Sequence, residues 1–290
     1  MRHVAFSLPL AAAFLALPVL KAQEPKPEPK NDYFTTSDGV KIHYITMGDH
    51  GTWVVLIHGF SDSAQRMFFT TGIAPALAKN HRVVALDNRN HGLSDKPNPN
   101  GSGRAEDTIE LMDHLKIVKA HIHGYSMGGG FTGQLLASHS DRFITAIFGG
   151  SGIQEVDEDL RKRAAAMDTS GPAPQGAEAA AFQHLRERAA ASRGNTTTPA
   201  PAPRPLQIDL TKVTIPVLAI NGEYDSPHAK TQRMSRELKN FSNVILPAKN
   251  HVGAIAVGGP MPQQYIDSLV DFIDANDAAM AKGSATSGGN

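Results

Sequence analysis

The stretch AHIHGYSMGGGFTGQLLASH, residues 120–139, places a single serine between an apolar run and a segment of helical spacing. The residues before Ser126 are typical of a buried strand, and those after it of a helix. Gly124 and Gly128 lie two positions either side of the serine, a G-x-S-x-G pattern that marks a sharp strand-to-helix turn. Glycine lacks a Cβ, so the chain can double back without collision at these two positions. The stretch therefore predicts one strand–turn–helix unit of an α/β sheet with a serine at its turn.

The rest of the chain repeats this alternation. Short apolar runs lie at 52–60, 81–87, 119–126, 144–150, 215–225 and 243–251, and helical spacing at 64–79, 104–116, 127–138, 229–240 and 262–276. The pattern predicts a mostly parallel sheet with helices on both faces, and Ser-Asp-Gly at 37–39 predicts an antiparallel N-terminal hairpin. Ligands bind beyond the carboxyl ends of such strands. Polar residues stand at the ends of five runs: His58, Asp87, Ser126, Asp225 and His251.

The domain organisation follows from composition. Residues 1–22 combine an early positive charge with an apolar run and predict a signal peptide, hence export to the periplasm or the exterior and no stable membrane association after cleavage. An uncleaved anchor is the alternative, disfavoured by Pro9, Pro18 and the short apolar run. Residues 23–31 predict a linker, 32–281 the folded domain and 282–290 a disordered tail. Residues 153–205 are rich in Ala, Pro and charge, which predicts a mobile insertion, or lid, over the strand ends.

Charge and cysteine content exclude several functions. The chain has 28 Lys and Arg against 28 Asp and Glu, so no basic field favours binding to nucleic acid. It has no cysteine, which rules out disulfides, thiolate catalysis and cysteine metal sites. Nothing in the sequence requires a protein partner or indicates an oligomeric state.

Ser126 needs a base to become a nucleophile, and the base needs a group that fixes its tautomer. Of the downstream histidines 139, 184, 228 and 251, only His251 directly follows a strand-like run. Asp225 ends the preceding apolar run and is the predicted acid, with Glu223 as the alternative. The sequence therefore predicts that Ser126, His251 and Asp225 form a catalytic triad.

The oxyanion formed by attack on a carbonyl needs two donors. The predicted donors are the backbone N–H groups of Met127, which directly follows the serine, and of Phe60, which Gly59 turns inward. The side chains of Phe60 and Met127 are expected to line the acyl pocket. His58, Gly59, Phe60 and Tyr125 are the predicted substrate-binding residues.

Five motifs stand in a familiar order: HGF at 58–60, DNRNHGLSD at 87–95, GYSMGG at 124–129, NGEYD at 221–225 and NH at 250–251. On these motifs the chain from about 33 to 273 resembles an α/β-hydrolase of the serine esterase and lipase type. In the second motif Asn90 replaces a glycine, a change that the tolerance of Asn for positive φ makes acceptable. Asp87, Arg89 and His91 are interpreted as structural, with a catalytic His91 as the minor alternative.

The resemblance implies hydrolysis through an acyl-enzyme, without a metal or organic cofactor. Because the insertion has few large apolar residues, we expect small to medium esters or lactones as substrates. A carbon–carbon bond hydrolase and a cofactor-free perhydrolase are alternatives that use the same triad. A small-molecule receptor that retains an intact triad is the alternative from another class.

Overall fold

The computed structural model of the chain describes residues 27–60, 62–98, 101, 103–193, 205–251 and 261–287. The predicted signal peptide at 1–22 lies outside these residues. Within them the strands are β1 (Lys30–Thr35), β2 (Lys41–Met47), β3 (Trp53–Ile57), β4 (Arg82–Leu86), β5 (Ala120–Tyr125), β6 (Phe143–Gly149), β7 (Val217–Gly222) and β8 (Phe241–Leu246). The helices are η1 (Gln65–Phe69), α1 (Ile73–Leu77), α2 (Glu106–His114), α3 (Met127–Ser138), η2 (Ser140–Arg142), α4 (Glu158–Ala166), α5 (Gly176–Arg193), η3 (Leu210–Lys212), α6 (Pro227–Glu237) and α7 (Gln263–Ser287).

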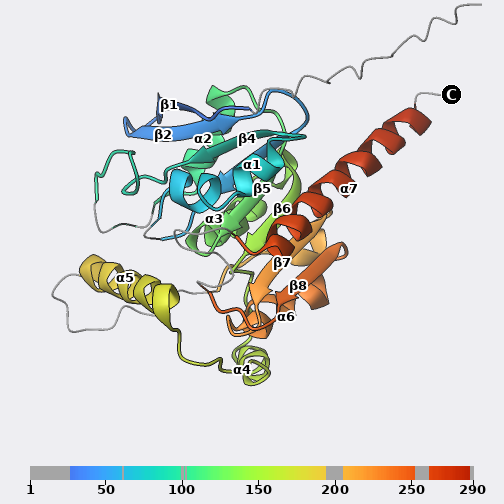
Figure 1. Ribbon diagram of the computed structural model, residues 1–290. Helices are drawn as coiled ribbons and strands as arrows, with labels where there is room; N and C mark the ends of the chain where they lie inside the picture. The colour runs from blue at the N-terminus through green and yellow to red at the C-terminus, as the bar shows by residue number, and fades with distance from the viewer. Residues whose placement is uncertain are drawn as a thin grey trace, which may run out of the picture.

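The described strands form one sheet in the order β1-β2-β4-β3-β5-β6-β7-β8 (Figure 1). β2 pairs antiparallel with β1 and β4, and the remaining neighbours pair parallel. The predicted fold class, a mostly parallel sheet with an antiparallel N-terminal hairpin, is therefore confirmed. Gly39, with φ +83°, closes the turn between β1 and β2.

Helices cover both faces of the sheet, as predicted. Along β3 the side chains alternate: Val55 and Ile57 join the apolar core under α2, α3 and α6, whereas Val54 and Leu56 join the core under η1, α1 and α7. Strands that are buried on both faces consist of continuous apolar residues. For this reason the strands could be predicted from the sequence. The crossovers bring the ends of β5, β7 and β8 to the same edge of the sheet.

Some boundaries differ from the prediction. The segment 64–79 forms two short helices, because Gly72 takes φ +92° between η1 and α1 and interrupts the helical bonding. The strand β1 begins at Lys30, inside the predicted linker. The prediction of a disordered tail from 282 is wrong as far as Ser287, because α7 continues to that residue. Among the described residues, no helix has the length and apolar character needed to cross a membrane.

A buried histidine lies in β5, one position before the glycine turn. His123 donates from Nδ1 to the carbonyl oxygen of Ile147 at 3.3 Å, and its Nε2 accepts from the Tyr265 hydroxyl at 3.2 Å. Burial lowers the pKa of His123 to about 4. The native protein therefore holds this ring neutral in the interior.

This burial should make stability fall in acid. The unfolded chain protonates His123 near pH 6.5 and the native chain only near pH 4, so stability is lost as the pH falls between these values. We expect His123 to account for a loss of about 3 kcal/mol in the free energy of unfolding. Urea unfolding of wild type and His123→Gln at pH 7 and pH 4.5 measures it. The variant should lose less stability over this interval, and equal losses would contradict the assignment.

Candidate active site

Ser126 lies at the turn between β5 and α3 in a strained conformation. Its φ of 53° and ψ of −111° are unusual for a residue other than glycine. The Ser126 N–H donates to the Gly149 carbonyl at 2.8 Å, and its carbonyl accepts from the Gly130 N–H at 3.1 Å. These bonds to β6 and α3 hold the strained residue in place, with its side chain half-buried.

The flanking glycines are required by close backbone contacts. A Cβ on Gly124 would lie 2.1 Å from the Gly128 carbonyl oxygen, and one on Gly128 would lie 2.0 Å from the Ile57 carbonyl oxygen. At Gly130, by contrast, no atom of the described residues lies within 4 Å of a Cβ position. The prediction that side chains at 124 and 128 would collide with neighbouring backbone is confirmed. The same reason does not apply to Gly130.

The structure brings Ser126, His251 and Asp225 together, and these three residues are called the triad below. The Ser126 Oγ lies 2.9 Å from His251 Nε2, and Asp225 Oδ2 lies 2.9 Å from His251 Nδ1. A carboxylate can only accept here, so Nδ1 carries a proton and Nε2 is left to accept one from the serine. Asp225 is buried, with 9% of its surface exposed.

The alternative acid, Glu223, has a different partner. Its Oε2 accepts from the backbone N–H of Ala248 at 2.7 Å, at a turn where Ala248 has φ +55°. The Tyr224 N–H also donates to the Lys249 carbonyl at 2.8 Å. Glu223 therefore holds the loop that carries His251, while Asp225 contacts the ring itself.

Tyr125, a predicted substrate-binding residue, is bonded to the loop that carries His251. Its side chain is buried, with 1% of the residue exposed, and its hydroxyl donates to the His251 carbonyl at 2.5 Å. Burial raises the pKa of Tyr125 well above its ordinary value, so the phenol stays protonated as a donor. Tyr125 therefore supports the loop that carries His251, and its predicted contact with substrate stays a prediction.

His58, another predicted substrate-binding residue, is bonded through both ring nitrogens to backbone groups. Its ring is fully buried, donates from Nδ1 to the Gly59 carbonyl at 2.7 Å and accepts at Nε2 from the Asn88 N–H at 3.0 Å. The side chain therefore shapes the loop after β3 from inside. A Cβ on Gly59 would lie 3.3 Å from the Cβ of Ser126, so this loop runs directly beside the serine.

The two predicted oxyanion donors directly follow the two residues of this contact, Phe60 after Gly59 and Met127 after Ser126. Phe60 follows Gly59 and is half-buried, with its ring against His91. Met127 is the first residue of α3, where a backbone N–H has no partner within the helix. The Met127 side chain is half-buried and packs against the core under α3. Donation to an oxyanion remains a prediction for both N–H groups.

The motif at 87–95 supports the loop that follows β3. Asp87 accepts from the Ala64 N–H at 2.7 Å, the Leu93 N–H at 2.8 Å and His43 at 2.9 Å. Burial raises the pKa of Asp87, but these three bonds outweigh it and hold the pKa below the ordinary value.

The other residues of this motif are also placed by local contacts. Asn90 takes φ +72° as expected. Arg89 pairs with Asp38 and Asp107, and His91 contacts the Arg89 carbonyl.

Lys230 is a site residue that the sequence did not reveal. It lies in the first turns of α6, and its Nζ is 2.5 Å from Asp225 Oδ1. A lysine five residues after an aspartate has no distinctive sequence pattern. Only the turn that ends β7 and starts α6 brings the two charges together.

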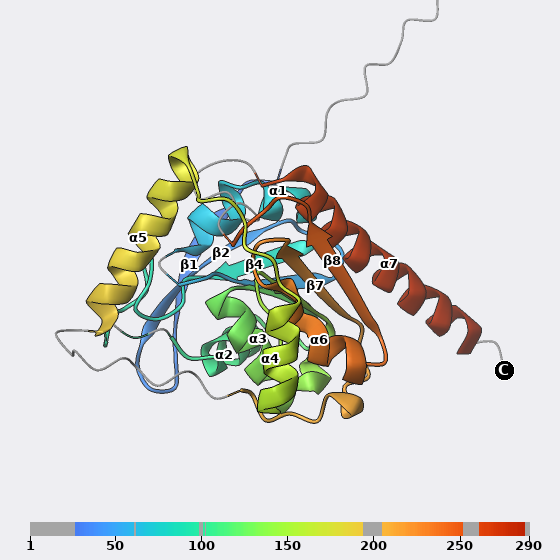
Figure 2. The ribbon, with the colours of Figure 1, turned by 90° about the horizontal axis from the view of Figure 1, so that it is seen from below.

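The insertion contributes α4 and α5, which both lie at one end of the molecule (Figures 1 and 2). Asp168, after α4, accepts from the N–H groups of His228 and Ala229 at the start of α6, at 2.8 and 3.0 Å. Glu178 of α5 accepts from Asn250, next to His251, at 2.9 Å. The described part of the insertion is thus tied to the elements that carry Asp225 and His251.

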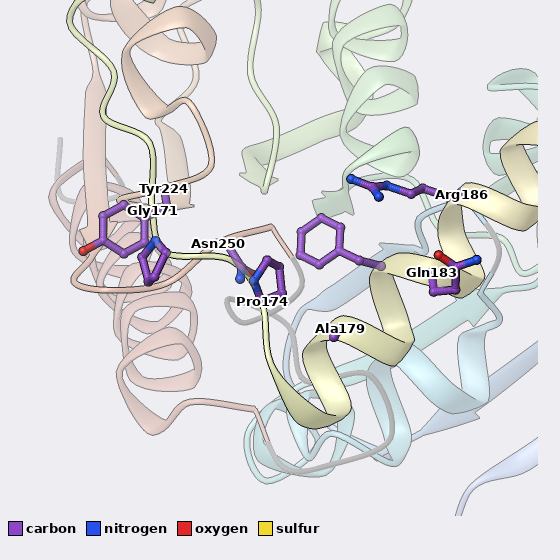
Figure 3. A pocket seen from close by; sticks show the side chains of 9 residues that line it. Gly171, Pro174, Ala179, Gln183, Arg186, Tyr224 and Asn250 are labelled. Atoms are coloured by element: carbon purple, nitrogen blue, oxygen red, sulfur yellow. The ribbon is translucent and has the colours of Figure 1, made fainter.

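A cavity of about 420 Å³ lies between α5 and these elements. Figure 3 shows Tyr224 and Asn250 on its domain side, with Gln183 and Arg186 projecting from α5. Its lining comprises Gly171, Pro172, Pro174, Ala179, Phe182, Gln183, Arg186, Tyr224 and Asn250. Tyr224 and Asn250 directly precede Asp225 and His251 in the chain, whereas the triad residues themselves are not part of this lining.

Comparison with known proteins agrees with this architecture. The family described as alpha/beta hydrolase fold matches residues 52–167. A region of 84 residues is 44% identical to the dihydrolipoyllysine-residue acetyltransferase component of an acetoin cleaving system from Pseudomonas putida, covering 28% of this chain and 22% of that protein. Esterase YbfF of Escherichia coli is 32% identical over 142 residues, 46% of this chain and 54% of that protein. These matches span about a fifth to a half of each relative.

Solved structures extend the likeness of the fold to most of the chain. A thermophilic esterase from Thermogutta terrifontis superposes with a TM-score of 0.59 at 18% identity, covering 86% of this chain and 99% of that one. A hydrolase from Pseudomonas aeruginosa gives a TM-score of 0.60 at 20% identity, over 84% and 98% of the two chains.

Proposed function

We propose that the chain is a serine hydrolase that cleaves carboxylic esters or lactones of small to medium size, because residues 52–167 match the family described as alpha/beta hydrolase fold and the structure has that fold. The observation that carries the proposal is the hydrogen-bonded series from Ser126 through His251 to Asp225. The names of the relatives YbfF and the Thermogutta enzyme, both esterases, support the same reaction.

The proposed reaction has two stages. Ser126 Oγ attacks the ester carbonyl while His251 Nε2 takes the serine proton, and the N–H groups of Phe60 and Met127 stabilise the oxyanion. The carbon–oxygen bond to the alcohol then breaks as His251 returns that proton to the leaving oxygen. In the second stage His251 takes a proton from water, the hydroxide attacks the acyl-enzyme, and the proton returns to Ser126 as the acid leaves.

The Asp225 carboxylate stabilises the imidazolium that forms in each stage. It also fixes the tautomer, since the proton on Nδ1 points at Oδ2. Tyr125 and Glu223 hold the loop that carries the ring. The positions of all three triad groups are therefore set before a substrate binds, and such preorganisation lowers the barrier.

The cavity between α5 and the loops that carry Asp225 and His251 supports the proposed substrate size. A volume of about 420 Å³ lies at the lower end of the range for small-molecule sites. Its aromatic and proline lining suits a short acyl or alcohol group, with Gln183 and Arg186 as polar contacts.

The test is hydrolysis of p-nitrophenyl acetate, butyrate, octanoate and decanoate by the purified protein. We expect kcat/KM to be highest for acetate or butyrate and lower by about tenfold or more for decanoate, because a long chain exceeds the cavity. The background is the rate with Ser126→Ala. A preference for decanoate would contradict the size assignment. Binding without turnover of any ester would favour the receptor alternative.

A further inference from the structure

Lys230 and His251 divide the two oxygens of the Asp225 carboxylate between them. Lys230 Nζ lies 2.5 Å from Oδ1, and His251 Nδ1 lies 2.9 Å from Oδ2. The exposed fraction of the side chain is 9% for Asp225 and 17% for Lys230. A cation this close and this sheltered from water acts strongly on the carboxylate.

The backbone around Lys230 is fixed by packing. A Cβ on Gly152 would lie 2.2 Å from the Lys230 carbonyl oxygen, so the segment after β6 abuts the first turns of α6. The Lys230 N–H donates to the Ser226 carbonyl at 3.2 Å. From the other side Asp168 caps the start of the helix through the N–H groups of His228 and Ala229. The Lys230 ammonium group therefore contacts Asp225 from a part of α6 whose backbone is held in place.

We infer that Lys230 is a positioning residue of the triad, which orients Asp225 and limits the basicity of His251. The inference rests on the proposed function of this site. The Lys230 charge partly cancels the negative charge of Asp225, and the imidazolium of His251 is stabilised less as a result.

The other charged groups that face this pair come from three elements. The Asp168 carboxylate, from the insertion, raises the pKa of Lys230. The Nδ1 of His228 lies 3.1 Å from the Oδ1 of Asp168. Burial lowers the pKa of Lys230, and the carboxylates of Asp225 and Asp168 oppose this effect. Tyr125 packs against the His251 ring and stays protonated. We therefore expect the charges of Lys230 and His251, which both contact Asp225, to act most strongly on its carboxylate.

The inference is tested with Lys230→Met, Lys230→Gln and Lys230→Arg, and with Lys212→Met as the control at an exposed Lys–Asp pair. In Lys230→Met the acid limb of kcat/KM should move to higher pH by about one unit, and kcat on the plateau should fall about tenfold with KM little changed. Lys230→Gln can still donate to Asp225, so it should shift the limb with a smaller loss of kcat. Lys230→Arg should keep the limb near its wild-type position.

A second readout is independent of turnover. The titration of the His251 ring, followed by NMR on isotopically labelled protein, should move to higher pH in Lys230→Met and Lys230→Gln and remain in place in Lys212→Met. An unchanged or lower midpoint in folded Lys230→Gln would overturn the inference, even if the wild type hydrolyses esters. Absence of ester turnover in the wild type would count against the proposed function, while the NMR titration would still decide the role of Lys230.

Discussion

Replacing Ser126 by alanine is expected to lower kcat/KM for p-nitrophenyl butyrate by at least about 10⁴-fold. The hydroxyl oxygen 2.9 Å from His251 Nε2 is the atom that forms the acyl-enzyme, and alanine offers no substitute. His251→Ala should cost about as much, since the serine then has no base. The double variant should be no slower than either single variant, because the two groups act as a unit.

The control is Ser138→Ala, at the far end of α3, where the hydroxyl donates to the Gln134 carbonyl within the same helix. This variant should keep wild-type activity. Unfolding curves for all four variants and the wild type show whether each is folded. More than a tenth of wild-type kcat/KM in Ser126→Ala, or additive losses in the double variant, would contradict the assigned nucleophile and base.

Gly128→Ala is expected to have the largest effect on the architecture of the site. Its Cβ would lie 2.0 Å from the Ile57 carbonyl oxygen and 2.9 Å from that of His58. Both are backbone atoms at the end of β3, so relief requires α3 to move away from the sheet. We expect a loss of about 3 kcal/mol or more in the free energy of unfolding. Activity should fall by about 100-fold or more, since Ser126 moves with the helix.

Gly130→Ala is the matched control two residues further along the same helix. In the part of the chain that the structure describes, nothing lies within 4 Å of its Cβ position, and alanine is favoured over glycine inside a helix by about 1 kcal/mol. This variant should be as stable as wild type or more so, with unchanged kcat/KM. Urea unfolding and kinetics on both proteins decide the matter. Equal stability and activity in the two variants would show that the close contact at 128 is not what shapes the turn.

The fold and the triad were accessible from the sequence for a specific reason. In a parallel sheet the strands are continuous apolar runs, and the polar residue that ends each run is carried to one edge. Ser126, Asp225 and His251 all stand at such positions, so their meeting follows from strand order alone. The glycines at 124 and 128 could be interpreted in the same way, because a sharp turn leaves no room for a side chain.

The remaining features depend on side-chain direction and on contacts between distant segments. The sequence alone does not show that Tyr125 points inward to the His251 loop, or that both nitrogens of the His58 ring are bonded to backbone groups. The contact of Lys230 with Asp225 likewise depends on where α6 begins after β7. The predicted export signal lies in residues 1–22, outside the described residues, and stays a prediction.

Covalent labelling tests the central claim, that Ser126 is an activated nucleophile, most directly. Intact protein is treated with a fluorophosphonate, digested, and the labelled peptide is identified by mass spectrometry. We predict one label per chain, on Ser126, with ester hydrolysis lost in proportion to labelling and no reaction in His251→Ala. A label on another residue, or full labelling of Ser126 with hydrolysis intact, would contradict the account.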